Sequence, residues 1–262
     1  MRRILFLLLF LLQFAGSALA TLPTTGVWWD PSKPGWGVAI QRNIDNTIFA
    51  VLFTYDETGR NTWYVMPDGK PQGDAVVGDV FEPTGPSYTN AVFDSTKVSM
   101  GAPVGTFRLA LDGDIGSFEF DIRGIHSVTP YIEPFIRKAT EAYSGVWWKP
   151  DESGWGMVNH NVFYGPSVRS TAFSALFVYA EDGHPTWFIM PDGQVSASID
   201  TEYVSGGVFR PSGPPLSATF DSTKVDVGPV IGRFDFTNFV NVTFQYALPG
   251  GNATKALKRF VF

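Results

Sequence analysis

The stretch Ile48–Tyr55 reads IFAVLFTY, an apolar run that has the two-residue period of a β-strand. Its side chains would alternate between two faces, with Phe49, Val51, Phe53 and Tyr55 on one and Ala50, Leu52 and Thr54 on the other. The next residues, Asp56–Arg60, include a glycine and predict a hairpin loop. A further strand, Asn61–Met66, follows directly. This part of the chain therefore predicts antiparallel β-structure.

The same strand occurs a second time, because Phe49, Phe53 and Tyr55 recur 124 residues later. Working outward from it, the matching segments are Gly26–Trp29 with Gly145–Trp148, Gly35–Gly37 with Gly154–Gly156, Trp63 with Trp187, Met66–Gly69 with Met190–Gly193, and Phe93–Val98 with Phe220–Val225. The offset grows from 119 to 127 along the chain. It indicates insertions at Tyr164–Ser170 and Ser196–Gly206, where we expect longer loops in the second copy.

Each copy has the length of one small domain. We therefore expect two homologous domains over 21–137 and 138–262, with a short polar linker near Arg137–Ser144. Further predicted strands of the first copy are Val76–Phe81, Ala91–Phe93, Gly105–Leu111, Ser117–Ile122 and Tyr131–Ile136.

Two repeated motifs are predicted to form turns. Pro67-Asp68-Gly69 would end the strand Asn61–Met66, because proline presets φ and glycine permits the reversal. Phe93–Val98 (FDSTKV) would form strand–turn–strand, with Asp94 bonded to the turn backbone. After the first twenty residues, no stretch of helical length has a convincing helical period. The predicted fold is all-β: two tandem homologous antiparallel β-meander domains, each a barrel or a sandwich.

The first twenty residues have the pattern of a secretory leader. Met1–Arg3 is basic, Ile4–Phe14 is apolar, and Ser17–Ala20 supplies small residues for a cleavage site. We expect cleavage after Ala20 and a periplasmic or secreted protein. The alternative, an uncleaved anchor, is disfavoured because the apolar segment is shorter than the ~20 residues that span a bilayer. No comparable segment occurs later, so no transmembrane helix is predicted.

The composition excludes several classes of protein. The chain is 44% hydrophobic, 15% aromatic and 17% charged, against a usual charged fraction of about 25%. This hydrophobic content excludes a disordered chain. The absence of cysteine excludes disulfides, thiol catalysis, cysteine-ligated zinc and iron–sulfur clusters. A formal charge of −6 argues against nucleic acid and anionic membrane surfaces as partners.

All eight tryptophans lie at repeated positions. They can pack in the core and close the ends of small barrels, or they can line a pocket for sugar rings or apolar molecules. Trp36 and Trp155 favour the second role, since the glycines beside them permit close backbone approach. Trp28 and Trp29 would point to opposite faces of a strand. The candidate ligand-binding residues are Trp36, Trp63, Tyr55, Trp155, Trp187 and Tyr179.

Repeated acidic residues offer a catalytic alternative. The repeated carboxylates are Asp68 and Asp192, Asp94 and Asp221, and Glu57 and Glu181. Two carboxylates per domain are what a glycoside hydrolase uses. Asp68 and Asp192, however, lie in Pro-Asp-Gly turns, where aspartate is favoured for backbone reasons. The serine beside Asp94 and Lys97 is similarly explained by a turn rather than by nucleophilic catalysis. We predict no catalytic residue.

The histidines give no metal pattern. His126, His160 and His184 have no histidine counterpart in the other copy, and His160 lies between two asparagines. The sequence has no HExxH, GxSxG, phosphate-loop or EF-hand spacing. We therefore expect no metal, no cofactor and no enzymatic activity.

The pattern GxWWxP…GWG…FxYxxxGxxxW, carried by Gly26–Trp63 and Gly145–Trp187, resembles a tandem β-domain found in exported proteobacterial proteins of unassigned function. The resemblance covers nearly all of the chain after the leader, and it brings no catalytic residues. In layout, a Gly-x-Trp first strand followed by a meander is similar to lipocalin and avidin barrels. This analogy favours ligand binding.

The expected function is a non-catalytic binding module for a small apolar or carbohydrate ligand, which the paired tryptophans would contact. The alternatives are a structural or envelope-associated protein, an outer-membrane β-barrel suggested by the aromatic content and by Phe262, and a glycoside-type hydrolase. The predicted strands are short for an outer-membrane barrel, which needs about ten residues in each. The sequence does not indicate the oligomeric state.

Overall fold

The structure, a computed structural model, describes residues 25–136, 144–162, 171–197, 202–215, 219–237 and 242–260. The predicted leader, residues 137–143 of the predicted linker and the insertion Tyr164–Ser170 lie outside these residues. Within the described residues, no helix is long and apolar enough to span a bilayer.

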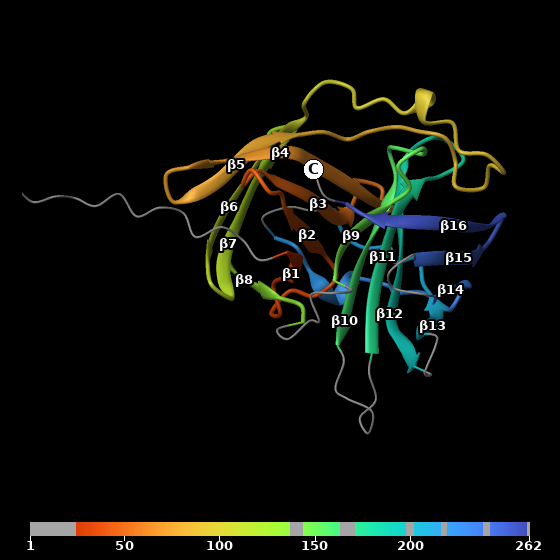
Figure 1. Cartoon of the computed structure of the whole chain (residues 1–262). Helices are drawn as coiled ribbons and strands as arrows, with labels where there is room; N and C mark the ends of the chain where they lie inside the picture. The colour runs from red at the N-terminus through yellow and green to blue at the C-terminus, as the bar shows by residue number, and fades with distance from the viewer. Residues whose placement is uncertain are drawn as a thin grey trace, which may run out of the picture.

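The first copy forms a closed antiparallel barrel in which each strand pairs with the next and β8 pairs with β1 (Figure 1). Its strands are β1 (Gly26–Trp29), β2 (Gly37–Arg42), β3 (Ile48–Tyr55), β4 (Asn61–Gln72), β5 (Ala75–Val80), β6 (Gly105–Asp112), β7 (Ile115–Ile122) and β8 (Ile125–Pro134).

The second copy forms an equivalent barrel, closed between β16 and β9. Its strands are β9 (Gly145–Trp148), β10 (Gly156–Val162), β11 (Thr171–Tyr179), β12 (Pro185–Ala197), β13 (Glu202–Val208), β14 (Gly232–Thr237), β15 (Val242–Leu248) and β16 (Gly251–Arg259). The prediction of an all-β fold with two tandem meander domains is confirmed, and both domains are barrels.

The interior of each barrel is filled by aromatic rings. In the first barrel, Phe107 and Phe118 are fully buried with ring centroids 5.1 Å apart. In the second, Phe234 and Phe244 are fully buried with centroids 5.2 Å apart. Each ring removes on the order of 150–250 Å² from water, so these interiors stabilise the fold without disulfides.

The predicted turn at Pro67-Asp68-Gly69 is wrong. Strand β4 runs through these residues, and its pairing with β3 shifts register there, from Ala50 opposite Met66 to Ile48 opposite Gly69. Proline fits such an irregularity because it has no N–H to give to the ladder. Glycine is required because a Cβ at Gly69 would lie 2.4 Å from the Met66 side chain. The motif therefore bends a continuous strand.

The second copy has the same bend in β12. A Cβ at Gly193 would lie 2.4 Å from the Met190 side chain. Longer loops were expected at Ser196–Gly206, but β12 extends to Ala197 and β13 covers Glu202–Val208. Most of this insertion therefore lies in strands, and residues 198–201 are outside the described part.

The predicted strand Ala91–Phe93 and the strand–turn–strand reading of FDSTKV are also wrong. The segment contains a single 3-10 turn, η1 (Ser95–Lys97), and η2 (Ser222–Lys224) is its counterpart. Asp94 accepts the N–H of Thr96, so the predicted bond from aspartate to the turn backbone is confirmed. The motif belongs to a long connection and not to a sheet, because its last residue, Val98 or Val225, packs on a glycine of the other copy.

Two long connections cross between the barrels, and we call them the arms. Arm 1 is 81–104, between β5 and β6, and the described parts of arm 2 are 209–215 and 219–231, between β13 and β14. Figure 1 shows arm 1, in yellow, passing from the first barrel over the second. Tyr88 of arm 1 donates its N–H to the Tyr179 carbonyl, and Gly213 of arm 2 donates to the Gly59 carbonyl. Each arm thus binds the other copy.

Candidate functional site

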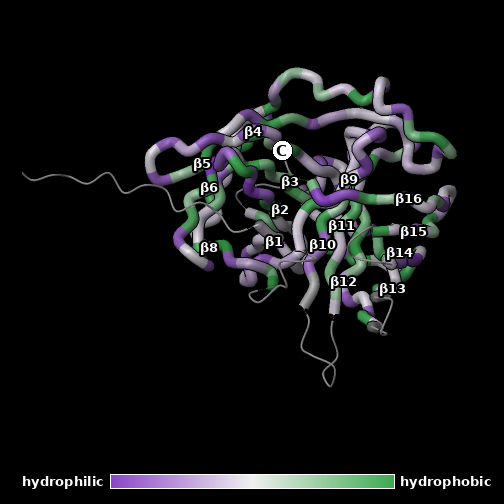
Figure 2. Tube along the Cα trace, viewed as in Figure 1, coloured by the Kyte–Doolittle hydropathy of each residue, from purple (hydrophilic) through white to green (hydrophobic). Residues whose placement is uncertain are grey.

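The candidate site lies where the outer faces of the barrels meet. Strands β3 and β11 are apolar on both faces, and hydrophobic residues follow them through the middle of the molecule (Figure 2). One face of β3 fills the first barrel, and the other, with Phe53 and Tyr55, faces the second copy. β4 and β12 also lie side by side. The apolar pattern on both faces of Ile48–Tyr55 follows from this double burial.

A chain of six rings crosses the contact between the barrels. The order is Tyr55, Trp187, Phe53, Phe177, Trp63 and Tyr179, and successive ring centroids lie between 5.4 and 6.2 Å apart. These separations are typical of favourable aromatic pairs. The Phe53–Phe177 contact is at the centre, and the two halves of the chain are equivalent residues of the two copies.

Hydrogen bonds across the contact follow the same two-fold pattern. Trp63 donates its indole N–H to the Val178 carbonyl at 2.9 Å, and Trp187 donates to the Thr54 carbonyl at 3.0 Å. Both tryptophans are buried. Each indole is therefore fixed by the backbone of the other copy.

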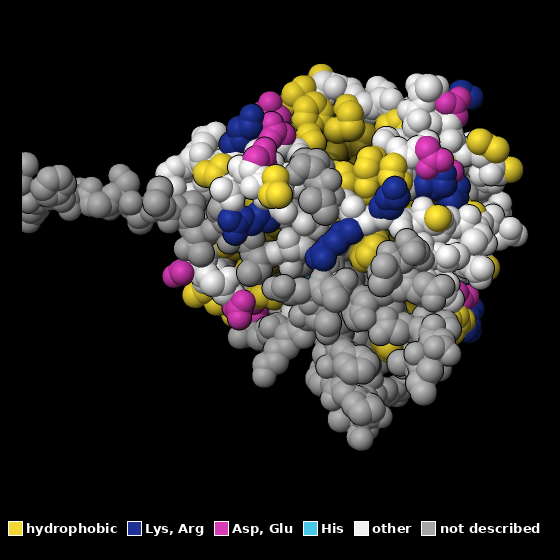
Figure 3. Space-filling model, viewed as in Figure 1, with side chains coloured by type: hydrophobic (Ala, Val, Ile, Leu, Met, Phe, Trp, Pro, Cys, Tyr) yellow, Lys and Arg dark blue, Asp and Glu magenta, His cyan; other side chains and the backbone are white. Residues whose placement is uncertain are grey.

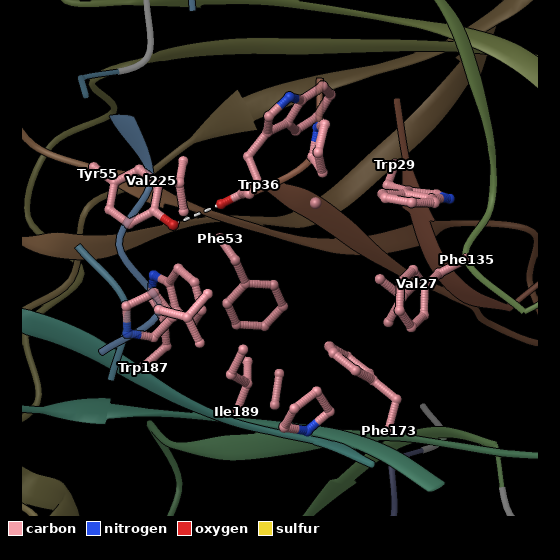
Figure 4. A pocket seen from close by; sticks show the side chains of 17 residues that line it. Val27, Trp29, Trp36, Phe53, Tyr55, Phe135, Phe173, Trp187, Ile189 and Val225 are labelled. Atoms are coloured by element: carbon pink, nitrogen blue, oxygen red, sulfur yellow. Dashed lines mark hydrogen bonds between the residues drawn. The ribbon is translucent and has the colours of Figure 1, made fainter. Parts of the chain in front are cut away.

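A cavity of about 230 Å³, which we call pocket A, lies at one end of the ring chain (Figure 4). The first copy contributes Trp29, Trp36 and Tyr55, and the second contributes Phe173, Trp187 and Val225. In Figure 4, Phe53 and Ile189 lie beside each other on one side of the space, and Phe135 and Phe173 lie across it. Pocket A is thus assembled from both copies.

A second cavity of about 210 Å³, pocket B, occupies the equivalent place at the other end of the ring chain. Here the copies exchange roles: Trp148, Trp155 and Tyr179 come from the second, and Phe49, Trp63 and Met100 come from the first. Figure 3 shows hydrophobic side chains gathered on the surface beside β4, the strand that supplies Trp63 and Pro67 to pocket B.

The two tyrosine hydroxyls in these walls already have partners within the protein. The Tyr55 hydroxyl donates to the Gly35 carbonyl at 2.7 Å, and the Tyr179 hydroxyl donates to the Gly154 carbonyl at 2.6 Å. Burial raises the pKa of both phenols well above the usual value, so they stay protonated. Trp29 Nε1 is buried without a partner, and Figure 4 shows it on the side of the indole away from Phe53.

The arms complete the pockets, which explains the repeated FDSTKV segment. Val225 of arm 2 packs on Gly35, where a Cβ would lie 2.5 Å from a Val225 methyl group. Val98 of arm 1 packs on Gly154 at the same distance. Each glycine has a φ near +119°, which L-residues rarely adopt. The first glycine of each Gly-Trp-Gly motif, Gly35 or Gly154, is therefore the residue on which the arm of the other copy packs.

All six predicted ligand-binding residues line the two pockets, three in each. Tyr55, Trp36 and Trp187 line pocket A, and Tyr179, Trp155 and Trp63 line pocket B. The two predicted tryptophans of each pocket come from different copies.

Trp36 and Trp155, the two tryptophans that the sequence favours as ligand contacts, line the pockets and also contact residues that lie outside them. The Trp36 indole points away from the centre of pocket A in Figure 4 and stacks on Phe118 at 5.9 Å. Trp155 donates its N–H to Glu152 Oε2 at 3.2 Å. Trp36 and Trp155 therefore join the barrel interiors to the pockets.

Sequence reasoning missed several lining residues. Trp29 and Trp148 line pockets A and B, while fully buried Trp28 is on the opposite side of its strand, so the predicted opposite orientation of Trp28 and Trp29 is confirmed. Phe135 and Phe260, each next to the end of the last strand of its barrel, also line the pockets and are absent from the predicted site residues. Only the double-sided apolar pattern of the strands indicated an apolar surface outside the barrels.

The acidic residues and His160 lie away from the pocket walls. Asp94 and Asp221 are partly exposed and cap η1 and η2, and Asp68 forms an ion pair with Lys70. His160 is buried and accepts the N–H of Val27 through Nδ1 at 3.5 Å. Across the described ranges, no three histidine, aspartate or glutamate side chains are grouped to hold a metal ion.

Comparison of the chain with protein-family models, curated proteins and solved structures gave no match. The resemblance to an exported tandem β-domain stays a prediction.

Proposed function

We propose that the protein binds small, uncharged apolar molecules in pockets A and B. The observation that carries the proposal is that the fold builds nearly the same apolar cavity twice, with about 230 and 210 Å³. Concave, mostly apolar pockets are the usual sites for small ligands. The lining consists of aromatic and aliphatic side chains from rigid strands and from the arms, so each pocket exists before a ligand enters.

The chemistry of the walls favours the apolar ligand over the carbohydrate. A sugar needs donors and acceptors for its hydroxyls, and an unpaired buried hydroxyl costs about 1–3 kcal/mol. The Tyr55 hydroxyl and the Trp187 indole N–H are already engaged with the backbone. A ligand charge would also lack a partner among the described lining residues, which include no lysine, arginine or carboxylate in either pocket.

The volume sets the ligand size. An apolar cavity of about 150 Å³ accommodates benzene. Pockets A and B are larger and fit one aromatic ring with a short substituent, two fused rings or a short aliphatic chain. For a ligand of about ten non-hydrogen atoms we expect a Kd on the order of 10 µM to 1 mM.

The proposed setting is outside the cytoplasm. The leader predicted over residues 1–20 would export the chain, and the absence of cysteine lets the mature protein fold without disulfide formation. A binding protein for small apolar molecules is compatible with either a periplasmic or a secreted location.

Calorimetric titration with naphthalene and indole tests the proposal, with glucose and cellobiose as polar comparators. Two sites should be found for the aromatic compounds and none for the sugars. Ile189→Trp fills pocket A and Val65→Trp fills the equivalent place in pocket B. Each variant should retain one site, and the double variant should retain none.

The opposite results are equally clear. If neither naphthalene nor indole binds, and Trp36→Ala lowers stability without any effect on titrations, the cavities are only imperfect packing between the barrels. Binding that persists in the double variant would place the ligand elsewhere. Thermal unfolding of every variant checks whether the fold is retained.

A further inference from the structure

The two pockets differ at one solvent-exposed lining position, which we call the lip. Met100 of arm 1 lines pocket B, and the equivalent residue of arm 2, Val227, lines pocket A. Both come two residues after the valine that packs on a Gly-Trp-Gly motif, Val98 or Val225. Met100 is 37% exposed and Val227 is 43% exposed. The lips are thus equally open to solvent, but only one carries sulfur.

Met100 also differs from the other described methionines. Met66, Met157 and Met190 are fully buried. The two that bend β4 and β12, Met66 and Met190, pack directly over Gly69 and Gly193. Met1 is in the predicted leader. Among the described residues, therefore, Met100 is the methionine that a water-soluble oxidant can reach without unfolding the chain.

We infer that Met100 is a site of selective oxidation to methionine sulfoxide, and that the modification weakens ligand binding in pocket B while pocket A is unaffected. The effect on binding rests on the proposed function. The oxidant is a hydroperoxide. The sulfur lone pair attacks the outer peroxide oxygen, an S–O bond forms and the O–O bond breaks. After proton transfer, water leaves if hydrogen peroxide is used. Sulfur is oxidised by two electrons and the peroxide is reduced.

The product changes the wall of pocket B. A thioether is apolar and adaptable, whereas a sulfoxide is a strong hydrogen-bond acceptor with a large dipole. At the lip of an apolar pocket it draws water toward the site, and a naphthalene molecule would have to displace that water. We expect affinity at pocket B to fall about tenfold, equal to about 1.4 kcal/mol. Val227 cannot be oxidised in this way.

Peptide mass mapping after treatment of the full chain with dilute hydrogen peroxide tests the modification. Met100 should gain one oxygen at least about ten times faster than Met66, Met157 and Met190. Equal rates at the buried methionines, or an unmodified Met100, would overturn the inference. This measurement is independent of ligand binding.

Naphthalene titration before and after oxidation tests the effect on pocket B. The treated protein should keep one site and lose affinity at the other. Met100→Val, which gives pocket B the residue of pocket A, should retain both sites after peroxide. Val227→Met should make pocket A sensitive as well. If Met100 is oxidised and both sites keep their affinity, the inference fails. If the untreated protein does not bind naphthalene, the proposed function itself fails and the claimed effect on pocket B falls with it.

Discussion

The two sides of the contact between the barrels use equivalent positions with different chemistry. Gln41 Oε1 accepts the N–H of Val146 at 3.3 Å, and His160 Nδ1 accepts the N–H of Val27 at 3.5 Å. These residues are exact counterparts at an offset of 119. Each also lies against the first glycine of the other barrel, Gly145 or Gly26. Either an amide oxygen or an unprotonated imidazole nitrogen can fill the position, because it requires only an acceptor.

The apolar frame of the contact is repeated more closely. Three contacts occur on both sides with distances that agree within a few tenths of an ångström. They are the packing of an arm valine on the first glycine of Gly-Trp-Gly, the indole hydrogen bonds of Trp63 and Trp187, and the hydroxyl hydrogen bonds of Tyr55 and Tyr179. The apolar contacts are repeated, whereas the polar position holds Gln41 on one side and His160 on the other. We infer that packing sets the geometry of the contact and that polar residues adapt to it. The following variants are ordered from the largest expected effect to the smallest.

Gly35→Ala and Gly154→Ala should be the most damaging pair. Each new Cβ would lie 2.5 Å from an arm valine, at a φ near +119°. Backbone strain and overpacking together should lower the free energy of unfolding by about 3–5 kcal/mol in each variant. Urea denaturation measures the loss, and equal losses are expected on the two sides.

A second glycine with a positive φ gives a lower limit for the backbone cost. Gly73 also has a positive φ, +65°, but a Cβ there would meet nothing within 4 Å. Gly73→Ala should therefore cost about 1 kcal/mol from the backbone alone. Adding Val225→Ala to Gly35→Ala should relieve part of the clash. If Gly35→Ala lowers the free energy of unfolding no more than Gly73→Ala does, Val225 of arm 2 is not tightly packed on Gly35.

Acid should weaken the side of the contact that uses histidine. Burial lowers the pKa of His160 to about 4, from 6.5 in the unfolded chain. Between these values the unfolded state binds more protons than the folded state. Stability is therefore full above pH 6.5 and declines as the pH falls toward 4, by about 3 kcal/mol in total. Denaturation midpoints at pH 7, 6, 5 and 4.5 measure this slope.

His160→Gln is the control, because it gives this side the residue of the other. The variant should lack the histidine contribution and should be less sensitive to acid than the natural chain over the same range. Since carboxylates titrate equally in both proteins, the difference between the two curves isolates His160. Parallel curves would show that the imidazole is protonated without cost in the folded state.

Much of this arrangement was predictable from single strands. The two-residue period in Ile48–Tyr55 and the repeat offsets predict two antiparallel meanders, and the duplicated tryptophans identify residues of both pockets. Periodicity reports which residues are buried, so it served well for strands and ring positions.

The partner of a buried face does not follow from periodicity. In Ile48–Tyr55 both faces are apolar, and nothing local shows that one of them packs on another barrel. The turn residues of FDSTKV predict local backbone geometry only, and they do not indicate that Val98 packs on Gly154 of the other copy. Pro67 was read as ending a strand because a bulge and a turn favour the same residue types.

Replacing Trp63 and Trp187, whose indoles donate hydrogen bonds to the other copy, should have an intermediate effect on the free energy of unfolding. Trp63→Phe and Trp187→Phe each remove an N–H donated to a buried carbonyl, of Val178 and Thr54 respectively. An unpaired carbonyl and a smaller ring should cost about 2 kcal/mol each. Thermal and urea unfolding should give the same loss for both. Losses that differ by more than about 1 kcal/mol would contradict the equivalence of the two sides.

Arg60 should have the smallest effect, since it is a polar and exposed part of the contact. Its guanidinium is 2.7 Å from Asp182 of the other copy, and both side chains are about half exposed. The counterpart of Arg60 is His184, which faces Asp56 at 3.4 Å; burial lowers the pKa of His184, so its imidazole is mostly uncharged at neutral pH. Exposed ion pairs contribute up to about 1 kcal/mol and are screened by salt. Arg60→Ala should therefore cost about 0.5 kcal/mol in dilute buffer and almost nothing in 1 M sodium chloride, measured by urea unfolding. A loss as large as that of Trp63→Phe, present in dilute buffer and abolished by salt, would mean that charge contributes as much to the contact as packing does.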